Sequence, residues 1–150
     1  MSITVQWLIE NRVMLVHFSG EIDSEQILAY LDESLAMRDK ANEVNGVNGP
    51  LVHTISDGTK VTKQAVDLGT IRKIMKSLRQ QRVGWSFYVS ENRMDRFVSS
   101  LAHQFGGIRY QSFATMAEAI QFLLDNDRDL REQIDENLET LLEKMQNSFS

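Results

Sequence analysis

The chain has 150 residues, of which 42% are hydrophobic and 25% are charged, values typical of one compact domain with a substantial core. It contains no cysteine, which excludes disulfides, thiolate chemistry and cysteine-based zinc or iron–sulfur sites. The formal charge is −5, no apolar run reaches the length of about 18 residues that a membrane span needs, and the first residues lack a basic leader, so we expect a soluble, cytoplasmic protein.

The first two predicted elements are strands. Apolar and polar positions alternate along residues 3–9, which predicts a strand with one buried face. In this alternation Leu8 falls on the polar side. Residues 13–19 are apolar on both sides, as is typical of an inner strand. The polar residues 10–12 predict a turn between them, so the two strands should form an antiparallel hairpin that ends at Gly20.

A first helix is predicted to begin at Asp23 or Ser24. Gln26 follows Asp23 by three residues, which is the spacing of a capping box. The apolar residues that follow at helical spacing are Ile27, Leu28, Leu31 and Leu35. Residues 42–50 (NEVNGVNGP) concentrate glycine, asparagine and the only proline, which predicts a loop after the helix.

The centre of the chain predicts a strand (LVHTIS, 51–56), a polar loop (DGTKVT, 57–62), a basic helix over 64–81 and a second strand (VGWSFYVS, 83–90). Such a unit builds a parallel sheet and leaves its loop at the carboxyl edge, where α/β proteins usually bind their ligands. The predicted core stripe of the helix is Leu68, Ile71, Met75 and Leu78, and its flank carries Arg72, Lys76 and Arg79.

Three further elements complete the predicted domain. Ser90 or Asn92 should cap a third helix over 92–105, and residues 108–113 predict a half-exposed final strand near a sheet edge. Thr115 and Glu118 form a capping box for a short helix, with Ala119, Ile120, Leu123 and Leu124 facing inward. The predicted fold class is an α/β sandwich with a mixed five-stranded sheet and helices packed on it.

We predict a domain of residues 1–125 followed by an acidic amphipathic helix within 126–150. The apolar stripe of that helix is Leu130, Ile134, Leu138, Leu141 and Met145. A stripe this narrow needs a partner surface, because a single helix of this kind is marginal in water. Either the helix folds back on the domain, or it forms a homodimer through residues 128–145.

Charge is distributed unevenly along the sequence. Residues 127–144 hold seven acids and three bases, whereas residues 60–82 hold seven bases and one acid. The acidic total and the absence of a nucleic-acid-binding motif argue against nucleic acid as the partner of the basic helix. A contact between the basic and acidic stretches, in the same chain or between chains, and a solvated surface remain the two interpretations.

Four polar residues should cluster where the third strand ends, beside a helix amino terminus that could stabilise an anion. With the basic flank they form the candidate surface for partner binding or modification: Ser56, Asp57, Thr59, Thr62, Arg72, Lys76 and Arg79. His17 and His53 could approach each other across the sheet, but two ligands do not make a metal site, so we interpret both as core histidines with hydrogen-bond partners. No catalytic or cofactor-binding motif is present, and we expect a protein that is not an enzyme and has no cofactor.

The order of these elements, the segment GEID (20–23) that closes the opening hairpin, and the polar loop before the second helix resemble the STAS family of anti-sigma-factor antagonists over residues 3–124. More narrowly they resemble small stand-alone STAS-like proteins of unassigned role. The resemblance implies a regulatory module that binds another protein. The more distant likeness to CRAL-TRIO domains implies, as the alternative, a carrier of a small apolar ligand or lipid.

In the STAS family, a serine or threonine in an Asp-Ser-Ser-Gly motif after the third strand is phosphorylated, which switches binding by adding charge. This sequence has Ser-Asp-Gly-Thr at 56–59 instead. Ser56, Thr59 and Thr62 therefore lie near the family's modified position without matching its motif.

Overall fold

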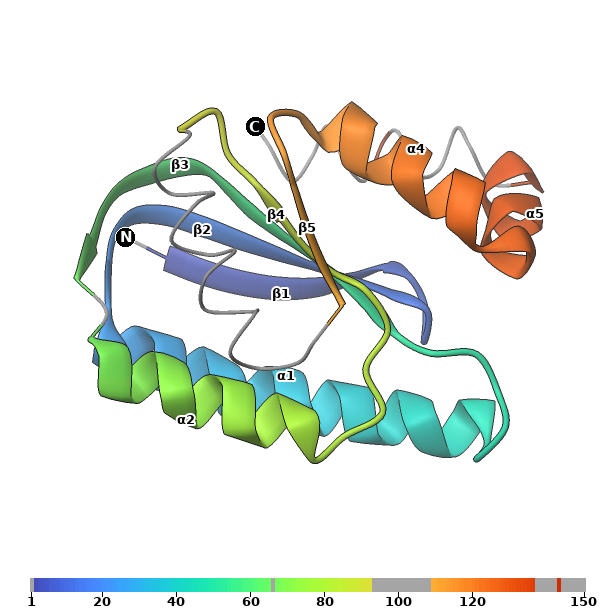
Figure 1. Cartoon of the computed structure of the whole chain (residues 1–150), viewed down its shortest axis with the longest axis horizontal. Helices are drawn as coiled ribbons and strands as arrows, with labels where there is room; N and C mark the ends of the chain where they lie inside the picture. The colour runs from blue at the N-terminus through green and yellow to red at the C-terminus, as the bar shows by residue number, and fades with distance from the viewer. Residues whose placement is uncertain (1, 66, 93–108, 137–142, 144–150) are drawn as a thin grey trace.

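The computed structural model describes residues 2–65, 67–92, 109–136 and 143. These residues form a sheet of five strands in the order β1-β2-β3-β4-β5, with helices on both faces (Figure 1). The strands are β1 (Ser2–Ile9), β2 (Val13–Asp23), β3 (His53–Ala65), β4 (Ser86–Val89) and β5 (Tyr110–Phe113). β1 is antiparallel to β2, and every later strand is parallel to its neighbour, so the predicted mixed sheet with its last strand at an edge is confirmed. The predicted third helix over 92–105 lies, except for Asn92, outside the described residues.

The opening hairpin forms as predicted, with one correction. Its turn is at residues 10–12, where Asn11 adopts a left-handed conformation (φ 61°) that asparagine tolerates better than most residues. The register shifts between Trp7 and Ile9, so Leu8 is an extra residue in β1. Leu8 is 2% exposed and belongs to the core, so its predicted place on the polar side was wrong because a bulge reverses the alternation there.

Helix α1 (Ser24–Asn45) has the predicted capping box. The Asp23 carboxylate accepts a hydrogen bond from the Gln26 backbone N–H (2.9 Å), and the Gln26 side chain accepts one from the Asp23 N–H (3.0 Å). The helix continues through residues 42–45, which were predicted as loop, and it stops at Gly46 (φ 84°). The side-chain amide of Asn45 then donates to the Pro50 carbonyl (3.2 Å), so this asparagine fixes the following loop from inside the helix.

Strand β3 is longer than predicted, and the segment DGTKVT is part of it rather than a loop. The reason is that β2 also continues past its predicted end, to Asp23, and pairs with residues 60–65 of β3. Gly20 permits this continuation, because the register shifts beside it and its φ of 75° suits glycine. The backbone groups of DGTKVT thereby gain ladder partners that a loop would not give them.

The predicted central unit is confirmed. β3 and β4 are parallel neighbours, paired from Thr54 with Ser86 to Asp57 with Val89, and α2 (Leu68–Arg79) lies between them in the chain. Met75 is buried as predicted, but Leu68 is 59% exposed. Its predicted core position was wrong because the helix begins only at this residue, so that Leu68 lies at the end of the helix instead of in its middle.

The helices divide between the two faces of the sheet (Figure 1). α1 and α2 lie side by side on one face, and the Ser24 hydroxyl at the start of α1 donates to the Asp67 carboxylate that caps α2 (2.9 Å). α4 (Met116–Asn126) and α5 (Arg128–Glu136) lie on the other face. None of the described helices is long and apolar enough to cross a membrane.

One apolar core cluster lies between the sheet and α4, and buried apolar residues such as Leu31 of α1 and Met75 of α2 lie on the opposite side of the sheet. The buried residues of the cluster are Leu8, Val13, Leu15, Ile55, Phe87, Val89, Phe113, Met116, Ala119, Leu123 and Leu130. Thr115 caps α4 through a hydrogen bond from the Glu118 N–H (3.3 Å), which is one of the two bonds of the predicted capping box. Leu130 of α5 is fully buried in this core, so the first turn of the acidic tail packs on its own chain.

Candidate functional site

The seven residues of the predicted partner-binding surface divide between β3 and α2. Asp57 is buried in β3, Ser56 is half-buried, and Thr59 and Thr62 are exposed. The flank residues Arg72, Lys76 and Arg79 are all exposed on α2. Because β3 runs almost directly into α2, the exposed hydroxyls and the bases belong to consecutive elements of the chain, and the bases extend along α2 to its last residue.

Asp57 holds the polar cluster on β3 together. One carboxylate oxygen accepts from Nδ1 of His17 (2.8 Å), and the other accepts from both the backbone N–H (3.0 Å) and the hydroxyl (2.7 Å) of Thr59. Burial by itself raises the pKa of Asp57, but the hydrogen bonds from His17 and Thr59 outweigh it and lower the pKa. The carboxylate is therefore ionised and fully engaged, so it orders Thr59 and has no free oxygen for a substrate.

Gly58 lies where no other residue fits. A Cβ atom on Gly58 would come within 2.3 Å of the Tyr88 hydroxyl oxygen and 2.6 Å of its Cζ. The Tyr88 ring, on the neighbouring strand, thus packs against the β3 backbone between Asp57 and Thr59. The position of Thr59 is fixed by this packing as well as by Asp57.

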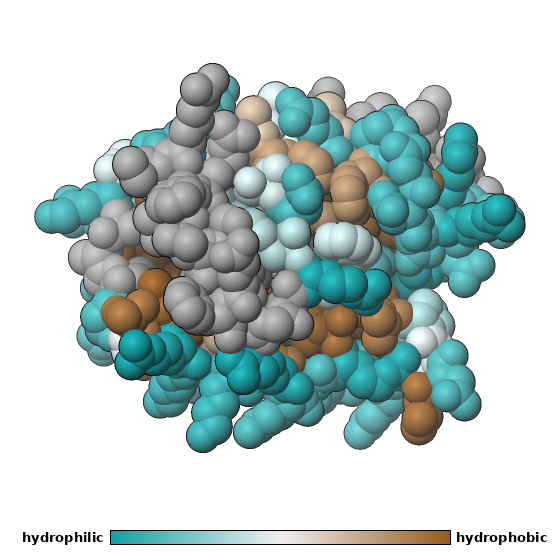
Figure 2. Space-filling view, viewed as in Figure 1, coloured by the Kyte–Doolittle hydropathy of each residue, from teal (hydrophilic) through white to brown (hydrophobic). Residues whose placement is uncertain are grey.

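The basic flank of α2 is a surface of cations. Arg72, Lys73, Lys76 and Arg79 are exposed, and hydrophilic side chains line the edge of the molecule where α2 lies (Figure 2). Arg72, Lys73 and Lys76 take part in no ion pair with the described residues. Lys73 was not among the predicted site residues, although its spacing from Lys76 places it on the same side of the helix.

The helix that carries these cations is firmly anchored at its start. The Asp67 carboxylate accepts from the Thr70 backbone N–H (2.7 Å) and from the hydroxyls of Thr70 (3.1 Å) and Ser24 (2.9 Å). The Thr70 backbone bond, followed by the hydroxyl of Ser24, lowers the pKa of Asp67. The basic side chains are therefore displayed on a helix whose position is set by its cap.

The expected contact between this basic helix and the acidic tail of the same chain is absent from the described part of the tail. α5 packs on the sheet face opposite α2 (Figure 1), because Leu130 is buried in the core on that face. Within Arg128–Glu136, therefore, the in-chain interpretation was wrong. Any pairing of these acids with the α2 bases has to occur between chains.

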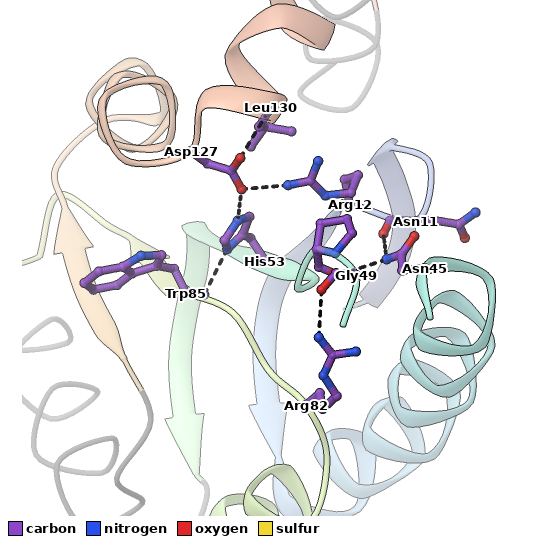
Figure 3. Close-up of polar contacts among 10 residues, drawn as sticks. Asn11, Arg12, Asn45, Gly49, His53, Arg82, Trp85, Asp127 and Leu130 are labelled. Atoms are coloured by element: carbon purple, nitrogen blue, oxygen red, sulfur yellow. Dashed lines mark hydrogen bonds and ion pairs between the residues drawn. The ribbon is translucent and has the colours of Figure 1, made fainter. Parts of the chain in front are cut away.

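A second polar cluster, which the sequence did not predict, lies at the opposite, amino ends of the strands (Figure 3). One oxygen of Asp127 accepts from Nη2 of Arg12 (2.6 Å) and from Nε2 of His53 (2.9 Å). The other oxygen accepts from the Leu130 backbone N–H (3.1 Å) and so caps α5. The backbone N–H of Trp85 donates to Nδ1 of His53 (2.9 Å), which places the imidazole proton on Nε2.

This cluster joins the starts of β2 and β3 to α5. Burial lowers the pKa of His53, and the Asp127 carboxylate opposes that shift without cancelling it, so the imidazole is neutral. For Asp127, burial raises the pKa, but the hydrogen bond from His53 and the other contacts outweigh it and lower the pKa. The result is an ion pair between the buried Arg12 and the half-buried Asp127, supported by a neutral histidine.

The two histidines do not form a metal site together. His53 is paired in register with Val13 at the start of the β2–β3 ladder, and His17 is paired with Asp57 near its middle, so the two histidines are separated along the strands. Each ring instead bonds a carboxylate. Across the described ranges there is no group of three or more histidine, aspartate or glutamate side chains that could hold a metal ion.

Two solved structures are similar to this chain in fold. One is an uncharacterized protein from the DUF3478 family with a SpoIIAA-like fold, from Shewanella loihica PV-4 (TM-score 0.53, 15% identity, 81% of this chain and 92% of that chain). The other is the anti-sigma factor antagonist SpoIIAA in its unphosphorylated form (TM-score 0.50, 19% identity, 81% of this chain and 97% of that chain). No protein-family model matches the sequence, and no curated protein does. The chain therefore has a STAS-like, SpoIIAA-like fold, as the order of its elements predicted.

Proposed function

We propose that the protein is a non-enzymatic regulatory module that binds an acidic surface of another protein through α2 and the adjoining end of β3. The observation that carries the proposal is the set of exposed bases on α2, of which Arg72, Lys73 and Lys76 have no acidic partner in the described chain. Cations that form no ion pair with the described residues could pair with a partner, and charge complementarity of this kind speeds association and selects partners. The shared fold with SpoIIAA, an anti-sigma factor antagonist, supports the same class of function.

The state of the polar groups supports a role without catalysis. Among the described residues, the histidine–carboxylate pair nearest the proposed surface is His17 with Asp57, which is largely buried, and the Nε2 atom of His17 is itself buried. A general base must reach the proton that it abstracts, and a buried nitrogen does not. The apolar-carrier alternative has no observation in its favour among the described residues.

Modification of this surface is a finer part of the proposal. Thr59 and Thr62 are exposed hydroxyls on β3, the strand that precedes the basic helix in the chain, and Thr59 donates its hydroxyl hydrogen to Asp57. A phosphoryl group on Thr59 would lose that hydrogen bond and bring a second negative charge against the buried carboxylate. Thr62 is therefore the better acceptor for a charge-adding modification that weakens binding to an acidic partner.

The acidic partner could be a second copy of this chain, and the simplest such assembly is a homodimer. Asp129 and Glu132 are exposed on α5, on the face opposite α2, so α5 of one copy could meet α2 of another. Such a contact is electrostatic and should weaken as salt screens it over a Debye length of about 8 Å at physiological ionic strength. The dimer is thus a testable variant of the same proposal.

The test compares the wild-type chain with Lys76→Glu on α2, and uses Lys40→Glu, the same change at an exposed base on α1, as the matched control. Partners are first captured from cell extract, and we select those that bind wild type and the control but not the α2 variant. When these partners are purified, we expect their affinity for the α2 variant to be at least tenfold weaker than for wild type. Analytical ultracentrifugation of the three proteins at low and high salt detects the dimer. If every partner bound all three proteins equally, and the three proteins formed dimers to the same extent, α2 would be excluded as the binding surface.

A further inference from the structure

Strand β1 forms one edge of the sheet, because β2 is its only neighbour among the described strands. Alternate residues of an edge strand direct their backbone N–H and C=O groups away from the sheet, where another strand can bind them. From Ser2 to Trp7 the pairing with β2 is regular, and the register shifts only after Trp7. β1 therefore presents a regular row of backbone groups along most of its length.

The other free edges of the described sheet are protected against such pairing. Proteins guard an edge by keeping its strand short or by placing charged residues on it. β5 has four residues and follows directly after the exposed Arg109, and the ends of β2 and β3 that extend past β1 and β4 carry the exposed Glu21, Lys60 and Lys63. β1, in contrast, has eight residues, none of which is charged, proline or glycine. It is thus the long edge that lacks this protection.

The two faces of β1 differ in polarity. Along the strand, half-buried apolar side chains alternate with exposed polar ones, in the order Ile3, Thr4, Val5, Gln6 and Trp7. Ile3 is paired with Phe18, whose ring packs edge-on against Tyr30 of α1 with the ring centroids 5.6 Å apart. Since paired residues share a face, the apolar side of β1 is the side that α1 covers. A strand that joins this edge needs the same alternation, so that apolar side chains meet on one face and polar ones on the other.

A second copy of β1 meets this requirement. In an antiparallel pair about a two-fold axis at Val5, each Val5 lies opposite its copy. The other opposed pairs are Ile3 with Trp7 and Thr4 with Gln6. Apolar residues then meet apolar ones, polar residues meet polar ones, and no like charges are opposed. An axis further along the strand would include the bulge at Leu8, and an earlier axis would leave Trp7 without an apolar residue opposite it.

We propose that β1 pairs antiparallel with β1 of a second copy of this chain, so that the two sheets become one continuous sheet across a two-fold axis at Val5. A contact of this kind closes on itself, because each copy uses its open edge in making it. The contact consists of backbone hydrogen bonds and apolar side chains, so high salt should not weaken it. It involves neither α2 nor α5 and is independent of the partner proposed for α2.

The register of this pair can be tested with single cysteines, because the chain has none of its own. Thr4→Cys chains that carry a tag are mixed with untagged Gln6→Cys chains and oxidised at high salt. Opposed Cα atoms in an antiparallel pair are about 4.5–5.5 Å apart, within the range of a disulfide, whereas residues offset by two positions are too far apart. We expect the mixed disulfide at least fivefold more often than a disulfide between two identical chains.

The exposed positions Thr4 and Gln6 also allow a test that spares the fold. Thr4→Lys/Gln6→Lys places lysine opposite lysine, whereas the matched control Thr4→Lys/Gln6→Glu places lysine opposite glutamate. We expect the control to dimerise at least tenfold more tightly than the first variant at physiological salt, as sedimentation velocity measures. Circular dichroism should show the same folded spectrum and Tm for the two variants when each is diluted to monomer.

The wild-type chain gives the first result. It should sediment as a dimer at high salt, where a contact between α2 and α5 of two copies is screened. A wild-type monomer under these conditions would overturn the proposal, and so would identical-chain disulfides as frequent as mixed ones or equal dimerisation of the two lysine variants. Each of these outcomes leaves the test of the α2 surface untouched, since that test measures a different partner on a different element.

Discussion

The guanidinium of Arg12 and the carboxylate of Asp127 are 115 residues apart in the chain and 2.6 Å apart in the structure. Arg12 precedes β2, and Asp127 separates α4 from α5. His53 joins the same carboxylate oxygen from the start of β3. Together these contacts hold α4 and α5 against the edge of the sheet where β2 and β3 begin.

Replacement of Asp127 by alanine should destabilise the fold strongly. The change leaves the buried Arg12 charge unpaired, removes the acceptor of His53 and uncaps α5, and we expect a loss of about 2–4 kcal/mol in the free energy of unfolding. Urea unfolding measures it. Asp125→Ala is the control, because Asp125 is exposed and bonds only Gln121, one turn away, and it should cost less than about 0.5 kcal/mol. Equal effects of the two changes would contradict the role of the ion pair.

The neutral state of His53 predicts a dependence of stability on pH. Its pKa is lower in the folded chain than the value of about 6.5 in the unfolded chain, so protons bind the unfolded state more readily. The stability that it contributes is complete above pH about 6.5 and is lost as pH falls from there toward the folded pKa. His53→Gln keeps a donor for Asp127 without titrating, so it should lose less stability than wild type between pH 7.5 and 5.5 on the same urea assay, whatever its stability at pH 7.5.

Asp57 acts in a different range of pH. Its pKa is lowered in the folded state, so its contribution is present above the unfolded value of about 3.9 and is lost as pH falls below it. Asp57→Asn should therefore flatten the loss of stability below pH 4 and leave the range near pH 6 unchanged. A variant that instead alters the slope near pH 6 would show that another group dominates this cluster.

Gly58→Ala should cost about 1–3 kcal/mol, because the new methyl group overlaps the Tyr88 ring, which is held within the sheet. The cost should be about 1 kcal/mol smaller in a Tyr88→Ala background, as a double-mutant cycle detects. Gly69→Ala is the matched control. Its Cβ would meet nothing closer than 3.2 Å, from the Asp67 carboxylate, and it should stay within about 1 kcal/mol of wild type.

Leu130→Ala tests whether the tail packs on its own chain. Leu130 is fully buried in the core, so its truncation should cost about 2–4 kcal/mol, and Glu132→Ala on the exposed side of α5 should be nearly neutral. Circular dichroism during thermal unfolding gives both values. If Leu130→Ala unfolded at the wild-type Tm, α5 would not be part of the core in solution.

The sequence predicted the elements that are specified locally. The Asp23 and Thr115 caps depend on residues three positions away, and the central strand–helix–strand unit depends on short apolar patterns, so both were found. The extension of β3 was missed because DGTKVT reads as a turn, and only its pairing with the end of β2 makes it a strand. Leu8 was missed for a similar reason, since a bulge is set by the partner strand.

The residues of the polar clusters and of the basic surface also divide into those that local spacing predicts and those that depend on long-range contacts. The exposed bases of α2 follow from helical spacing alone, and they lie on its surface as expected. The bond from Arg12 to Asp127 joins residues that nothing in the linear sequence connects, although Asp127 could have been read as a helix cap. Arg38 was overlooked because an arginine in a charged helix is ordinarily solvated, and only the packed structure shows it enclosed.

The bond between Arg12 and Asp127 also bears on how the chain is made. During synthesis the hairpin that carries Arg12 leaves the ribosome long before Asp127 has been translated, and a domain generally folds as a unit. We expect nascent chains whose Asp127 is still inside the ribosomal tunnel to be cleaved rapidly by protease, and chains from which residue 136 has emerged to resist it. The amino-terminal hairpin is therefore stabilised only after an aspartate near the end of the domain has been translated.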